Sequence, residues 1–107
     1  MFIRKTLLIA VAAAVAAPAF AADSESRFRG RRIVEANCAV CHAIAQVDES
    51  ENPDAPAFRA LARLRPLAPL RKEMAGELFL RHAVMPDFEP TPEQVDDIVD
   101  FIESIQQ

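Results

Sequence analysis

The 107 residues of the chain allow one domain, and their formal net charge is −4 at neutral pH. A nucleic-acid-binding protein would carry a basic face instead, so this class of function is excluded. The 86 residues that follow the leader described next are near the lower size limit for a core that is stable by itself.

Residues 1–21 are typical of a secretory signal peptide. Arg4 and Lys5 form a positively charged start, an almost unbroken apolar run follows, and Ala19-Phe20-Ala21 is a small-x-small cleavage site. An uncleaved membrane anchor is the alternative, but the run is short for a span of about 20 residues and it ends in small residues and a proline. We therefore expect cleavage near Ala21/Ala22, export to the periplasm, and no stable membrane insertion. The mature domain would be residues 22–107, with a net charge of −6.

The first helix of the mature chain is predicted over residues 24–39. Asp23 or Ser24 can cap its start, and Glu25 suits the positive end of the helix dipole. Gly30 lies in the helix interior, where glycine costs about 1 kcal/mol relative to alanine. It indicates that another helix approaches closely there, the alternative being a tolerated surface glycine. The solvated face is expected to carry Arg27, Arg29, Arg31 and Arg32.

The segment Cys38-Ala39-Val40-Cys41-His42 carries the clearest chemical signal in the chain. Two cysteines three apart, with a histidine directly after the second, form the attachment motif of c-type haem. Each thiol can add to one haem vinyl group, and the imidazole can bind iron as the proximal ligand. One alternative is a redox C-x-x-C pair, which favours a βαβ context that is missing here. The other is a zinc site, which would need a second pair of ligands.

Prolines interrupt the pattern between this motif and the last helix. Residues 43–56 are predicted to form a surface loop whose acidic side chains are solvated. A short helix is predicted over residues 57–65. Pro69 suits the first turn of a middle helix that runs to about His82 and buries one face. An extended segment, residues 83–88, follows it.

The last helix has the clearest boundary signals. Thr91 is an N-cap, Pro92 occupies the first helical position, and Gln94 completes a Thr-x-x-Gln capping box. The apolar face consists of Val95, Ile98, Val99, Ile102 and Ile105, with Phe101 at its margin. The face expected in water carries Asp96, Asp97, Asp100 and Glu103. No segment shows the two-residue alternation of a strand, so we predict an all-α domain.

Three side chains can supply a second axial ligand, and a thioether among them would stabilise ferrous iron and raise the reduction potential. Met74 lies within an amphipathic helix, the usual place of a core methionine. His82 lies at the end of that helix, where surface exposure or helix capping accounts for it. Pro86 holds Met85 extended, which can aim its side chain inward. We therefore favour Met85, with His82 next; the alternative is a buried methionine beside an open iron site.

These motifs resemble the class I monohaem cytochromes c, specifically the small soluble bacterial type. The resemblance covers Gly30 to Ile105 and includes Ala55-Pro56-x-Phe58 and Met85-Pro86-x-Phe88. It implies a small fold of three to five helices wrapped around one covalently bound haem c. Attachment would be at Cys38 and Cys41, with His42 and Met85 as the ligands of the iron.

The resemblance also implies roles for residues around the haem. The Pro56 carbonyl would accept a hydrogen bond from His42, and Phe58 would belong to the cofactor site. Gly30 would pack against Phe101 of the last helix. The chain has no Trp or Tyr, so the haem propionates would need other donors, for which Arg59, Arg63 and Arg65 are the candidates. For each arginine by itself, a place on a solvated helix face is the alternative and the favoured interpretation.

The sequence therefore predicts an electron carrier rather than an enzyme. It would cycle a six-coordinate haem between ferric and ferrous states in a respiratory or other periplasmic redox chain. We expect a monomer whose redox partner proteins dock electrostatically at the haem edge. One alternative is a ligand-binding or peroxidase-like protein in which Met85 leaves the iron. The other is a haem domain that works as a subunit of a larger oxidoreductase.

Overall fold

The computed structural model describes residues 19–82 and 84–107. Its elements are α1 (Ala19–Asn37), the 3₁₀ turn η1 (Phe58–Ala60), α2 (Leu61–Leu64), α3 (Leu70–Met74), α4 (Glu77–Arg81) and α5 (Pro92–Ser104). The described ranges hold helices and loops but no strand, which confirms the all-α prediction. Except for Ala19–Ala21, the predicted signal peptide lies outside them.

The first helix starts earlier than the sequence predicted. It begins at Ala19 rather than residue 24, and it ends at Asn37 rather than residue 39. Asp23 and Ser24 lie inside the helix, so neither caps it. Alanine is the strongest helix former, and the alanines before Asp23 therefore extend the helix upstream. No helix within residues 19–82 and 84–107 is both long and apolar enough to cross a membrane.

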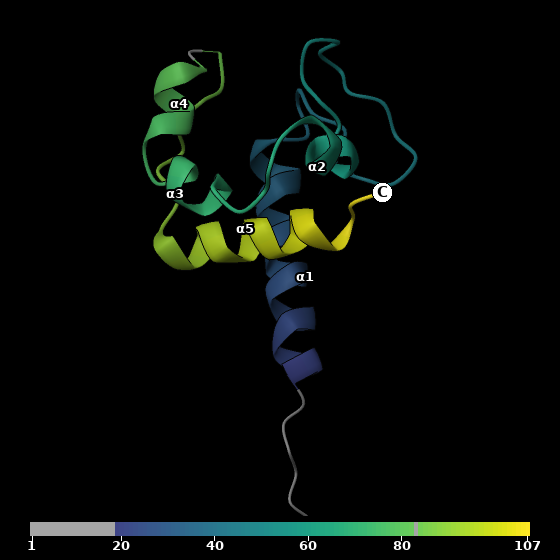
Figure 1. Cartoon of the computed structure of the whole chain (residues 1–107), viewed down its shortest axis with the longest axis vertical. Helices are drawn as coiled ribbons and strands as arrows, with labels where there is room; N and C mark the ends of the chain where they lie inside the picture. The colour runs from purple at the N-terminus through teal and green to yellow at the C-terminus, as the bar shows by residue number, and fades with distance from the viewer. Residues whose placement is uncertain (1–18, 83) are drawn as a thin grey trace, which may run out of the picture.

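The centre of the fold is the crossing of α1 and α5, which Figure 1 shows lying across each other. At the crossing, a Cβ on Gly30 would overlap the carbonyl oxygen of Asp97 and lie 3.0 Å from the nitrogen of Ile98. The helix backbones are thus in direct contact, as the helical glycine indicated. Phe101 is buried in the same core, but the atoms that exclude a side chain at residue 30 belong to the Asp97–Ile98 peptide.

The last helix starts as predicted. The Thr91 hydroxyl accepts a hydrogen bond from the Gln94 N–H at 3.2 Å, and the Gln94 side chain accepts one from the Thr91 N–H at 2.9 Å. Its buried face carries Val95, Ile98, Val99, Phe101 and Ile102.

The prediction that Asp97 faces water is wrong, because the residue is only 8% exposed. It is buried because α1 supplies its partners. The Ser26 hydroxyl lies 2.7 Å from one carboxylate oxygen, and the Arg29 guanidinium donates to both oxygens at 2.9 and 3.1 Å.

The middle of the chain differs from the single helix that was predicted between Pro69 and His82. It forms two short helices, α3 and α4, separated at Ala75 and Gly76. Glycine is a poor helix former, and no neighbouring side chain compensates here, because nothing lies within 4 Å of a Cβ at residue 76. The helix α3 buries Leu70 and Met74, whereas α4 buries none of its residues. The segment predicted as a helix over residues 57–65 is divided into η1 and α2.

Candidate cofactor site

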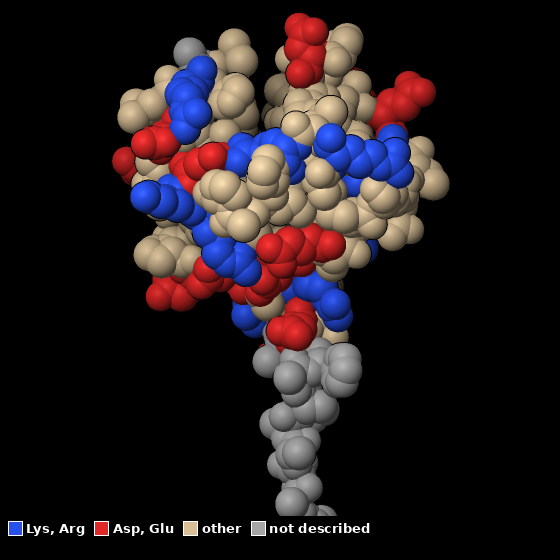
Figure 2. All heavy atoms as spheres, in the orientation of Figure 1, with Lys and Arg blue, Asp and Glu red and all other residues tan. Residues whose placement is uncertain are grey.

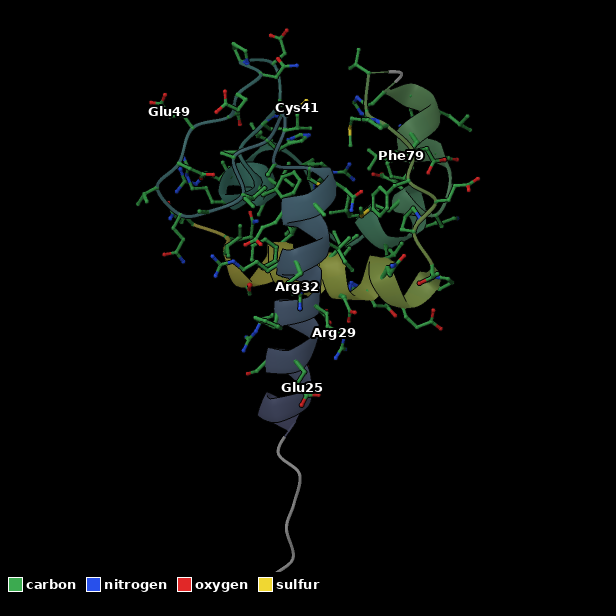
Figure 3. All side chains as sticks on the ribbon, turned by 180° about the vertical axis from the view of Figure 1, so that it is seen from behind. Glu25, Arg29, Arg32, Cys41, Glu49 and Phe79 are labelled. Carbon is green, nitrogen blue, oxygen red and sulfur yellow. The ribbon has the colours of Figure 1, made fainter. Side chains whose placement is uncertain are left out.

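A largely apolar cavity of about 370 Å³ lies between two lobes of the molecule. One lobe consists of the loop after α1 with η1 and α2, and the other consists of α3, α4 and the segment up to Phe88. Figure 2 shows a notch between the lobes at the top of the view. Figure 3 shows Cys41 and Phe79, which both line the cavity, on opposite sides of it. Ile98 and Ile102 of α5 also contribute to the lining.

The end of α1 delivers the Cys38–His42 motif to this cavity. The chain leaves the helix in a tight turn, in which the N–H of Cys38 donates to the Val34 carbonyl at 2.8 Å. The N–H groups of Cys41 and His42 then both donate to the Cys38 carbonyl, at 3.1 and 2.9 Å. Both cysteines line the cavity, and neither forms a disulfide. Burial raises the pKa of Cys38 to about 11, so its free thiol is protonated at neutral pH.

The imidazole of His42 is held from two directions. Its Nδ1 lies 2.8 Å from the carbonyl oxygen of Pro56. A carbonyl can only accept, so Nδ1 carries the proton and Nε2 keeps its lone pair for a metal. The Phe58 ring packs against the imidazole, with ring centroids 4.7 Å apart and planes tilted by 36°. Phe58 is buried and lines the cavity, as does Pro56.

Polar side chains order the loop of residues 43–56, and one of them is Asp48, an acid that was expected to be solvated. The Asp48 carboxylate accepts from the N–H groups of Ile44 and Ala45, at 2.9 and 3.0 Å, and pairs with Arg59 at 3.1 Å. The Ser50 hydroxyl accepts from the Ala43 N–H at 2.8 Å. The short spacing between Asp48 and the N–H groups before it is a local signal that could have been recognised. The pairing with Arg59 depends on the fold.

All three candidates for the second axial ligand line the same cavity. Met74 is fully part of the core, at 6% exposed. His82 is an exposed residue at the C-terminal cap of α4, and the Met85 N–H donates to its carbonyl at 2.8 Å. Met85 is half-buried. Beyond it, Phe88 makes an edge-to-face contact with Phe79, at 6.1 Å between centroids, which closes the segment back onto α4.

Of the three arginines considered for the propionates, Arg65 lines the cavity. It forms an ion pair with Glu73 at 2.6 Å, and this guanidinium holds the pKa of Glu73 below its usual range. Arg59 and Arg63 point elsewhere. Arg59 bonds to Asp48, and Arg63 donates to the backbone carbonyl of Gln107 at 2.9 Å.

The residues on the cavity fit a covalently attached haem. Two free thiols stand at the required spacing, beside an imidazole whose Nε2 is available. The other lobe adds a thioether, and the apolar walls with a single guanidinium at their edge suit a flat apolar group that carries carboxylates.

Comparison with known proteins adds one result. Residues 28–106 match the family model described as Cytochrome c. Neither the search of curated proteins nor the search of solved structures returned a match.

Proposed function

The chain belongs to the cytochrome c family and carries a covalently bound haem c with iron, and on this premise we propose that it is a soluble periplasmic electron carrier with His42 and Met85 as its iron ligands. Haem iron supplies one-electron chemistry by alternating between ferric and ferrous states. The chain's own residues hold the group, orient its ligands, exclude water and present an edge to a partner.

The shared cavity of Cys38, Cys41, His42 and Met85 is the observation that carries this proposal. The two thiols would form the thioether bonds. The Pro56 carbonyl keeps the proton of His42 on Nδ1 and so directs Nε2 toward the metal. This hydrogen bond also raises the basicity of the imidazole, and that basicity influences the reduction potential.

Burial and position favour Met85 as the second ligand. Met74 is packed in the core with α5, and using it would open that packing. His82 is exposed at the C-terminal cap of α4, so its side chain would have to leave the solvent in order to bind the iron. Met85 lies on the cavity in a segment with no regular structure, which can adjust to a metal without breaking a helix.

The surface around the cavity suits the docking of a redox partner. Val40, Leu64 and Val84 line the cavity and are exposed, so apolar side chains surround its mouth. A redox partner could cover this rim while electrons pass through the haem edge. We propose that the chain acts in this way as a monomer, and that Arg65 faces the propionates.

The ferric spectrum of the purified holoprotein tests the ligand assignment. We expect a low-spin spectrum with the weak long-wavelength band of sulfur-to-iron charge transfer. Met85→Ala removes this band, lowers the reduction potential and opens the iron to cyanide or azide. Met74→Ala is the matched control and leaves the band in place, and His82→Ala does the same. A wild type that is already high-spin and binds small ligands quickly would instead support the peroxidase-like alternative.

The leader is tested separately. We propose cleavage near Ala21/Ala22, because residues 1–21 have the composition of a signal peptide. The intact mass of protein isolated from the periplasm should correspond to residues 22–107 plus one haem. A membrane-bound protein with the mass of the full chain would favour the uncleaved anchor.

A further inference from the structure

The side chain of Gln106 bridges three backbone groups of different segments. Its Nε2 donates to the carbonyls of Phe58, at 2.6 Å, and Ile102, at 2.8 Å, while its Oε1 accepts from the Ala62 N–H at 2.8 Å. Two carbonyls and one N–H also fix which end of the amide is nitrogen. Every N–H that this amide can donate is therefore used.

The Phe58 peptide is held on both sides. Its carbonyl accepts from Gln106, and its N–H donates at 2.9 Å to the carbonyl of Ala43, the residue after His42. Its ring packs on the imidazole of His42. Pro56, which provides the acceptor for Nδ1, is only two residues earlier in the chain.

The far end of this chain of contacts is the best-packed part of the fold. Ile102 is 2% exposed and lies on α5, the helix that Gly30 of α1 contacts directly. The core therefore holds the carbonyl of Ile102 in a fixed position. Through Gln106, this carbonyl helps to hold Phe58 in place, and Phe58 in turn packs on the imidazole of His42, whose Nδ1 bonds to the nearby Pro56 carbonyl.

From these contacts we propose that Gln106 is a positioning residue for His42, acting through Phe58. The inference rests on the proposed role of His42 as an iron ligand. It means that α5, through Gln106 and Phe58, helps to hold this histidine in place. If Gln106 no longer holds Phe58, the hydrogen bond from Nδ1 to Pro56 loosens. A weaker bond lowers the basicity of the imidazole, which disfavours the ferric state. The reduction potential should then rise.

The test compares Gln106→Glu with Gln107→Glu in the holoprotein. Glutamate at residue 106 keeps the length and the acceptor for Ala62 but has no N–H for the two carbonyls. The side chain of Gln107 bonds only to the Gln46 carbonyl, at 3.3 Å. Gln107→Glu therefore adds the same charge at the adjacent residue and serves as the matched control. We expect Gln106→Glu to raise the midpoint potential relative to Gln107→Glu and to speed exchange of the His42 Nδ1 proton, measured by NMR.

Gln106→Met provides a second, uncharged variant of similar length in case Gln106→Glu does not fold. It should also raise the potential and speed the exchange. If Gln106→Glu matches Gln107→Glu, and Gln106→Met matches the wild type, in potential and exchange rate, and the Gln106 variants differ only in their unfolding midpoints, Gln106 is merely structural and the inference is wrong. Failure of the proposed function is distinguishable, because it would already appear in the ferric spectrum of the wild type.

Discussion

The two proposed iron ligands come from segments that the fold holds in very different ways. His42 is bonded to Pro56, packed on Phe58 and tied through Gln106 to the buried helix α5. Met85 follows α4, a helix with no buried residue, which contacts α3 and meets Phe88 through the aromatic pair of Phe79 and Phe88. We infer that the protein's own contacts fix the position of His42 more firmly than that of Met85.

Ion pairs connect the lobe that contains Met85 (α3, α4 and the segment up to Phe88) to the rest of the molecule. Arg71 of α3 donates to Asp100 of α5 at 2.7 Å, and Arg65 pairs with Glu73 at 2.6 Å. Charge pairs at a partly exposed surface contribute little to stability and weaken with salt. Leu70 and Met74 hold α3 in the core, whereas α4 buries none of its residues, so α4 is the part of this lobe that is held least firmly.

The largest expected contrast is in amide hydrogen exchange of the ferric protein. Amides of α5 should exchange only on global unfolding, with a free energy in the range of about 5–15 kcal/mol that is usual for small domains. Amides of α4 should exchange through local opening that costs much less. Met85→Ala should speed exchange in α4 further and leave α5 close to the global limit. Equal protection of the α4 and α5 amides from exchange would contradict the inference that the fold holds the Met85 segment less firmly than the His42 segment.

The next largest effect is expected at the helix crossing. Gly30→Ala places a methyl group against the backbone of Asp97, which cannot rotate away, so α5 must shift. Overpacking of this kind costs roughly 1–3 kcal/mol or more. Urea unfolding of the holoprotein measures the loss. A variant with the midpoint of the wild type would mean that α1 and α5 are not in backbone contact.

A smaller effect concerns acid stability of the same crossing. The hydrogen bonds from Arg29, and then from Ser26, hold the pKa of Asp97 below its usual value of 3.8. The unfolded chain therefore binds this proton first as the pH falls. The stabilisation from Asp97 is complete above about pH 4 and disappears as the pH falls through the lowered folded value.

Asp97→Asn should remove that part of the acid sensitivity and destabilise the protein at pH 7 by about 1–3 kcal/mol, since the buried Ser26 hydroxyl and the Arg29 guanidinium lose a charged acceptor. Unfolding midpoints at several pH values measure both effects. Asp96→Asn is the matched control, because that side chain is 63% exposed, and it should change the midpoint at pH 7 little. An acid profile of Asp97→Asn that parallels the wild type would contradict the assignment.

The smallest effect is expected at the other glycine. A Cβ at Gly76 meets nothing within 4 Å. Gly76→Ala should change stability by less than about 1 kcal/mol, in the stabilising direction if the unfolded chain loses freedom. The same added methyl group thus lowers the free energy of unfolding at residue 30, where α1 meets α5, and changes it little at residue 76, between α3 and α4. Equal costs at both glycines would remove the distinction.

The sequence by itself determined the features whose chemistry lies within a few residues. The Cys38–His42 motif, the capping box from Thr91 to Gln94 and the close approach at Gly30 are all local patterns, and the structure has the cap and the approach where they were expected. The all-α class followed from periodicity alone.

Tertiary structure decided the rest, because the partners are far apart in the chain. Asp97 was expected in water, since nothing near it in sequence indicates that Ser26, 71 residues earlier, would meet it. The break at Gly76 depends on whether neighbouring elements cover that turn, and the role of Gln106 depends on Phe58, 48 residues away. A polar side chain in a helical pattern is interpreted as solvated until the fold brings it a partner, and for Asp97 the packing of α1 on α5 supplies that partner.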